Sequence, residues 1–199
     1  TLTEDRPPRH FLDQVYDNDG ILACLEEGQW HFAMRTVLID YDPDIAPEFG
    51  YNRAFQKPTD WVLTSALCSD EFFREPLSDY VDETGYWYAE LDALYVRFVS
   101  NSDSYGGNLG LWPASFEQFV AAHFATKISL ELGMDSTKLQ LFHNPANPKH
   151  TVRGRALLLA KSRGAMAAGT KTQAQGSWSR SRMGNSGRRD RGNTSGNLY

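Results

Sequence analysis

The chain has little cysteine and no long apolar run. Only two of its 199 residues are cysteine, Cys24 and Cys68. They could form one disulfide, but a chain of this length does not require one, and we expect both thiols to be reduced and buried. No window approaches the roughly 18 uninterrupted apolar residues that a membrane helix needs, and the polar N-terminal stretch lacks the apolar core of a secretory signal. We therefore expect a soluble, unexported protein with no membrane partner.

Catalytic and metal-binding signatures are also missing. The five histidines fall singly, without an HExxH motif or His and Cys pairs at zinc-ligand spacing. The stretch YGGNLG at 105–110 has the spacing of neither common phosphate-binding loop, so we interpret it as a connection. Asp40, Asp42 and Asp44 alternate, but Pro43 and the missing later glycine and glutamate exclude an EF-hand. We expect no enzymatic activity, no metal and no cofactor.

The charges of the chain are unevenly distributed. The net charge of -5 hides 24 acidic and nine basic residues in 1–148, against one acidic and 11 basic residues in 149–199. Such asymmetry is typical of a chain whose basic end meets an anionic surface, while the acidic part repels nucleic acid or keeps the protein soluble. The alternative is a solvated acidic body with a basic tail that has no specific role.

The first half of the chain predicts one helix followed by a small sheet. Apolar residues at helical spacing predict a helix over about 9–27, although Gly20 costs about 1 kcal/mol relative to alanine inside it. The segment 30–41 favours a strand pair or one long bent strand. In 93–100, apolar residues alternate with Tyr95 and Arg97, which indicates an antiparallel strand with one buried face. The sheet should therefore lie within about 30–100.

Helices return in the second half. The pattern predicts helices over about 114–132 and 136–168, with Asp135 or Ser136 as the cap of the second. The stretch NPANP at 144–148 either breaks that helix, which then restarts with Asn147 as cap and Pro148 at the first position, or kinks it. The whole pattern predicts an α+β fold with an adaptor body over 1–170: a helical bundle, made by the N-terminal helix and the C-terminal helices, with a small antiparallel sheet subdomain.

Residues 171–199 form a basic C-terminal arm. The arm is too poor in apolar residues to offset its ordering entropy, so we expect it to extend from the body and to fold on a partner. Arginine offers a fork of donors to carboxylates and phosphates, and isolated large apolar side chains are typical anchors. The alternative is a solvated tail with incidental aromatic residues. The candidate contact residues are Trp178, Arg180, Arg182, Arg188, Arg189, Arg191, Leu198 and Tyr199.

Several stretches, taken in order, resemble a phage protein family. They are GQWHFAMRTVLI, YNRAFQKPTDWV, LDALYVRFVSN and WPASFEQFVAAHFATKISLEL, followed by the basic tail. Together they resemble tail tubular protein A and the head-tail connector adaptor proteins of tailed bacteriophages, from about Arg9 to the C-terminus. The sequence departs from the family at NPANP, where the family more often continues its helix, and in its short N-terminal region. The residues that match the family motif are Trp30, Phe32, Phe55, Pro58, Asp60 and Trp61.

The resemblance implies a virion structural protein without catalysis. Family members form a ring of about twelve subunits beneath the portal protein, and a cyclic ring repeats one heterologous interface until it closes. The implied partners are the portal, the tail tube or nozzle protein, other copies of the chain and the double-stranded DNA in the lumen. The implied location is the head-tail junction, or neck, after assembly in the host cytoplasm. The alternative from another class is a nucleic-acid-binding protein with a disordered arginine-rich arm.

Overall fold

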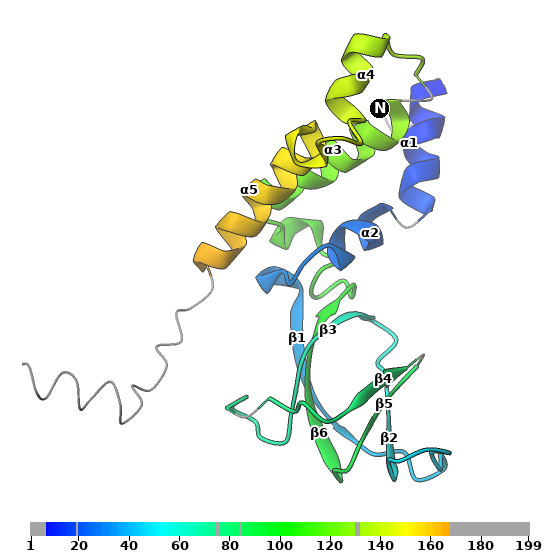
Figure 1. The fold of residues 1–199 in the computed structure, drawn as a ribbon, viewed down its shortest axis with the longest axis vertical. Helices are drawn as coiled ribbons and strands as arrows, with labels where there is room; N and C mark the ends of the chain where they lie inside the picture. The colour runs from blue at the N-terminus through cyan, green and yellow to red at the C-terminus, as the bar shows by residue number, and fades with distance from the viewer. Residues whose placement is uncertain (1–6, 19, 75, 84, 130–131, 168–199) are drawn as a thin grey trace, which may run out of the picture. The chain divides into compact units, whose positions relative to one another are not determined.

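A computed structural model describes residues 7–18, 20–74, 76–83, 85–129 and 132–167 (Figure 1). The described residues have an α+β fold, with five α-helices, three short 3-10 helices and two antiparallel sheets of three strands each. This confirms the predicted class and the predicted position of the sheet between helices. None of the helices in these ranges is long and apolar enough to cross a membrane.

The first sheet has β6 at its centre. The strand order is β1 (Met34–Asp40), β6 (Ala93–Ser100) and β3 (Trp61–Cys68), and all pairs are antiparallel. The segment 30–41 therefore forms one strand, which the short helix η1 (His31–Ala33) precedes. The predicted alternation in β6 is confirmed, because Leu94, Val96 and Phe98 are fully buried. Val99, however, is also fully buried and packs in a second core on the helical side.

The second sheet is shorter and packs against the first. Its order is β2 (Arg53–Gln56), β5 (Tyr86–Ala89) and β4 (Val81–Glu83), again antiparallel. Phe55 pairs with Trp87 in its register, and both side chains are fully buried. They form one hydrophobic core with the inward-facing side chains of the first sheet, including Leu94, Val96 and Phe98. The aromatic residues in this part of the sequence therefore serve mainly to hold two small sheets together.

The prediction of one N-terminal helix over 9–27 is wrong. The chain forms α1 (Pro7–Asp17) and then α2 (Gly20–Glu26). Gly20 begins the second helix at a point of close approach, since a Cβ at this position would lie 2.6 Å from the Val15 carbonyl oxygen and 2.7 Å from the Phe124 ring. The glycine therefore permits a bend that brings α1 and α2 against α3 (Ala114–Ser129).

The predicted helix over 136–168 is also interrupted. It consists of α4 (Ser136–Phe142) and α5 (Val152–Ala167), which the short helix η3 (Pro148–His150) separates. The break is thus the correct alternative, because the prolines of NPANP have no backbone N–H and clash with a preceding helical turn. Asp135 is the cap position of α4. Asn147 makes no side-chain cap bond, and α5 is capped by Thr151, whose hydroxyl accepts a hydrogen bond from the Gly154 amide at 3.0 Å.

The second hydrophobic core joins the helices to the end of the first sheet. Its central side chain is Trp30, whose Nε1–H donates to the carbonyl oxygens of Cys24 and Leu25 at 3.1 Å each. The Trp30 ring also meets the Phe116 ring edge-on, with 4.8 Å between centroids. The buried members of this core are Cys24, Leu25, Trp30, Ala33, Val62, Val99, Phe116, Phe119, Val120 and Ala160.

Candidate functional site

The candidate residues of the arm and of the family motif have different outcomes. Trp178, Arg180, Arg182, Arg188, Arg189, Arg191, Leu198 and Tyr199 lie outside the described residues. All six motif residues lie in described segments. Trp30 and Phe32 belong to the helical core, and Phe55 and Trp61 belong to the core between the two sheets. Pro58 and Asp60 form the turn that leads into β3, as predicted.

Asp60 joins three strands at one end of the first sheet. Arg35 of β1 places Nη1 at 2.7 and 2.8 Å from the two carboxylate oxygens of Asp60. Ser100, the last residue of β6, donates its hydroxyl to the same carboxylate, and the Asn101 amide donates to the Asp60 carbonyl at 3.1 Å. Burial alone would raise the pKa of the Asp60 carboxyl, but these bonds and the Arg35 charge outweigh it and lower the pKa below its usual value. Asp60 is therefore ionised and holds β1, the start of β3 and the end of β6 together.

A second tie connects the two sheets. The Lys57 ammonium lies 2.5 Å from Asp82 Oδ1 and 3.9 Å from the centre of the Trp61 ring. The other Asp82 oxygen accepts hydrogen bonds from the Trp87 indole and from the Thr64 hydroxyl, both at 3.0 Å. The sequence pattern pointed to Trp61 but not to Asp82, since the strand that carries Asp82 is short and the neighbours of Asp82 in the sequence form no pattern. The charged groups of this cluster are engaged with one another and with aromatic rings.

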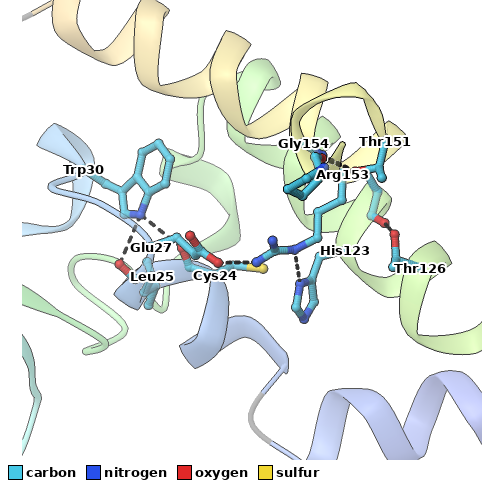
Figure 2. Close-up of polar contacts among 11 residues, drawn as sticks. Cys24, Leu25, Glu27, Trp30, His123, Thr126, Thr151, Arg153 and Gly154 are labelled. Atoms are coloured by element: carbon cyan, nitrogen blue, oxygen red, sulfur yellow. Dashed lines mark hydrogen bonds and ion pairs between the residues drawn. The ribbon is translucent and has the colours of Figure 1, made fainter. Parts of the chain in front are cut away.

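A third polar network lies among the helices and was not predicted (Figure 2). Arg153 of α5 extends between Glu27, which follows α2, and His123 of α3. Its Nη2 pairs with a Glu27 carboxylate oxygen, and its Nε–H donates to His123 Nδ1 at 3.0 Å. The Arg153 guanidinium also lies over the Phe119 ring, 5.5 Å from its centre. Because 126 residues separate Glu27 from Arg153, no local sequence pattern could have paired them.

His123 is buried and electrically neutral in this network. His123 is 4% exposed, and burial together with the charges of Arg153 and Lys127 lowers the pKa of its ring to about 4. Cys24 lies close by, and its burial raises the pKa of the thiol to about 12. A thiol with that pKa stays protonated at neutral pH and is a poor nucleophile. Burial of Cys24 and Cys68 is confirmed, and the two residues do not form a disulfide.

The sheets present a predominantly acidic surface. Residues 34–103 contain 14 acidic and five basic residues. All five cations lie against a carboxylate or an aromatic ring, namely Arg35, Arg53, Lys57, Arg74 and Arg97. The excess negative charge therefore remains at the surface. The exposed acidic residues are Asp40, Asp44, Glu48, Glu71, Asp79, Asp82, Glu83, Glu90, Asp92 and Asp103.

Apolar and basic groups occur instead along α5 and near the start of α3. A groove of about 210 Å³ lies between η1, the first turn of α3 and the second half of α5, and its lining includes Trp30, Phe32 and Ala160. Two leucines of the short helix η2 (Leu109–Leu111) and Leu158 of α5 are about half exposed. Residues 149–167 contain five basic residues and no acidic one. The groove and these half-exposed leucines are apolar areas of the kind that protein contacts use.

The ionisable groups described above make contacts between elements of the described ranges. No group of three or more His, Cys, Asp or Glu residues in these ranges could hold a metal ion. The ion pairs described above connect secondary-structure elements, and the buried thiol of Cys24 is protonated. No model of a known protein family matches the chain, and no curated protein matches it.

Proposed function

We propose that the chain is a virion structural protein, a head-tail connector or adaptor of a tailed bacteriophage. The observation that carries this proposal is the collinear resemblance, in which four stretches and a basic tail follow in the family's order over most of the sequence. The described structure adds support of a physical kind. The motif residues Trp30, Asp60 and Trp61 act in packing and in ties between strands, as expected of a protein whose task is to hold a shape.

The proposed assembly is a ring beneath the portal protein. Copies of the chain, about twelve by resemblance, repeat one heterologous interface until the ring closes. Half-exposed leucines and a groove lined by Trp30 and Phe32 provide apolar area for such an interface. The basic residues of α5 and the acidic surface of the sheets also provide opposite charges that neighbouring subunits can pair. The tail tube or nozzle protein attaches to the ring on the side away from the portal.

The acidic surface has a proposed role in the channel for double-stranded DNA. Phosphates bind tightly where Lys and Arg displace counterions, so a wall of like charge lets DNA slide without sticking. Exposed carboxylates in the sheets or in the loops beside them, such as Glu83, Glu90 and Asp103, are the candidates to face the lumen. The basic arm at 171–199 then takes the opposite role and docks on the portal at the virion neck, after assembly in the host cytoplasm.

The arm provides a direct test of this proposal. The full chain and a chain without residues 171–199 would each be mixed with the portal protein from the same genome and analysed by sedimentation. We expect the full chain to co-sediment with the portal and the truncated chain to stay free, with unchanged circular dichroism of the body. A matched control, in which the eight candidate arm residues stay and only residues 171–176 are replaced by Gly and Ser, should still bind. Equal binding of the full and truncated chains would overturn the role of the arm.

A second candidate function is nucleic-acid binding. The observation that favours it is the run of five basic residues without an acidic one in 149–167, continued by the six further basic residues of the arm. Fluorescence anisotropy with a labelled oligonucleotide at low and physiological salt distinguishes the two functions. Strong salt-dependent binding that disappears with the arm, together with no binding to portals, would favour this alternative over the adaptor.

A further inference from the structure

The loop that follows β3 carries an exposed aromatic side chain. Phe72 lies in the segment 69–74 and is 62% exposed, more than any other phenylalanine among the described residues. Its neighbour Phe73 is only 5% exposed, and the Arg97 guanidinium lies over its ring at 4.3 Å from the centre. The loop therefore buries one of two adjacent phenylalanines and leaves the other in solvent.

Hydrogen bonds within the loop fix the position of Phe72. The Asp70 carboxylate accepts hydrogen bonds from the Phe72 and Arg74 amides at 3.2 Å each, and the Phe73 amide donates to the Asp70 carbonyl at 3.3 Å. Phe73 has a φ of 53°, and a bulky residue keeps this left-handed conformation only where its surroundings hold it. Because the turn is already ordered, Phe72 loses little conformational entropy when it binds a partner.

The apolar groove between η1, the first turn of α3 and the second half of α5 has the size for such a side chain. Its volume is about 210 Å³, and an apolar cavity of about 150 Å³ already binds benzene. Rings of Trp30, Phe32 and Phe116 line it, and an inserted ring can pack edge-on against them. The α5 side carries the small residues Ala160 and Gly164, four positions apart on one helix face, which leave the groove open.

The charges beside the loop and the groove are opposite. Glu71 stands next to Phe72 and is exposed, whereas Arg163 lines the groove and is also exposed. Neither charge takes part in an ion pair among the described residues. The Arg74 guanidinium lies 4.9 Å from the centre of the Phe72 ring, so it covers one face of that ring. Opposite charges at the edge of an apolar contact favour one partner and one orientation.

We propose that Phe72 of one copy of the chain inserts into this groove of a neighbouring copy, with Glu71 beside Arg163 of that neighbour. The inference rests on the proposed ring and names a contact between its subunits. A loop between strands that meets a groove among helices is a heterologous contact, so each copy can offer its loop to one neighbour and its groove to the other. Repetition of this contact can close a ring.

Self-association of the full chain, measured by analytical ultracentrifugation at rising concentration, tests the loop side of the contact. The variant Phe72→Ser should raise the Kd of self-association about 10- to 100-fold, as for the loss of an anchor side chain. Because Phe72 is exposed, its circular dichroism should stay unchanged. The matched control is Leu38→Ser, which removes an apolar side chain of β1 that is 53% exposed and should leave the Kd unchanged.

Two substitutions in the groove test the other side. A Cβ at position 164 would meet no atom within 4 Å, so Gly164→Leu should fold normally, fill the groove and raise the Kd as much as Phe72→Ser does. Ser162→Leu, at an exposed position of α5 outside the groove, is its control. Arg163→Glu should raise the Kd about two- to five-fold, as for an exposed ion pair. The further change Glu71→Arg should restore part of the affinity, because it reverses the pair.

Photo-cross-linking locates the contact and distinguishes its failure from that of the proposed function. A full chain with benzoylphenylalanine in place of Phe72 would be mixed with ¹⁵N-labelled chain that lacks the probe, with and without the portal protein. We expect cross-links to ¹⁵N-labelled peptides of the groove. Cross-links to another surface, or an unchanged Kd in Phe72→Ser and Gly164→Leu, would overturn the contact and leave the ring standing. A chain that neither self-associates nor cross-links to another copy, even with the portal, would overturn both.

Discussion

The buried neutral histidine makes the stability of the body depend on pH. His123 has a pKa of about 4 in the folded protein, whereas an unfolded histidine titrates near 6.5. Between these values the unfolded chain binds a proton that the folded chain does not. The stability due to neutral His123 is therefore fully present above pH 6.5 and is lost as the pH falls toward 4.

The size of the effect follows from the two pKa values. Proton linkage gives a loss of about 1 kcal/mol at pH 5.5 and about 2–3 kcal/mol at pH 4.5, relative to pH 7.5. The assay is urea unfolding of the full chain, followed by tryptophan fluorescence at these pH values. The variant His123→Gln should lack this loss, because its amide oxygen can accept the Arg153 hydrogen bond and does not titrate.

The comparison between the two proteins isolates His123 from the other titrating groups. The control is His150→Gln, at an exposed position of η3, which should keep the pH dependence of the original chain. If His123→Gln lost stability with falling pH as steeply as the original chain, the reasoning about the Arg153–His123 pair would be refuted.

Three further substitutions test the packing and the polar ties by urea unfolding. Gly106→Ala should destabilise the body by about 1–3 kcal/mol, because its Cβ would lie 2.4 Å from the backbone oxygen at the end of β6, while Gly50→Ala, with nothing within 4 Å, should be nearly neutral. Asp60→Asn should cost about 1–3 kcal/mol, since it leaves the arginine of β1 without its carboxylate, and Asp103→Asn on the exposed loop is its control. Trp30→Phe keeps a ring but removes the two indole hydrogen bonds, so we expect the free energy of unfolding to fall by about 1–2 kcal/mol. If any of the three variants unfolds with the same free energy as the original chain, the role assigned to the substituted residue is contradicted.

The sequence predicted those features that depend on local patterns. The strand with alternating Leu94, Val96 and Phe98, the turn at Pro58–Asp60 and the burial of both cysteines are all confirmed. Each of them follows from residues close in sequence, because strand periodicity and turn chemistry act over a few residues. Local patterns could not predict that the strands divide into two sheets, because this division depends on which strands pair with one another.

The errors have a common physical origin. The single helix at 9–27 fails because Gly20 packs against Phe124, about a hundred residues away in the sequence, so its effect on the chain is tertiary. The network of Glu27, His123 and Arg153 was missed for the same reason. In contrast, the sequence already indicated a possible break of the helix at NPANP, because two prolines close together act on the local backbone. Most of the polar clusters described above are thus formed by contacts between residues far apart in the sequence, and a single sequence does not reveal such contacts.

The proposed function requires that the chain close into a ring that docks under a portal. The most direct measurement is electron microscopy of the purified full chain mixed with the portal protein from the same genome at physiological salt. We expect a closed ring of about twelve subunits, stacked coaxially on the portal, with the carboxylates of the sheets facing its lumen. A chain that stays monomeric in the presence of portals, or a ring with a strongly basic lumen, would contradict it.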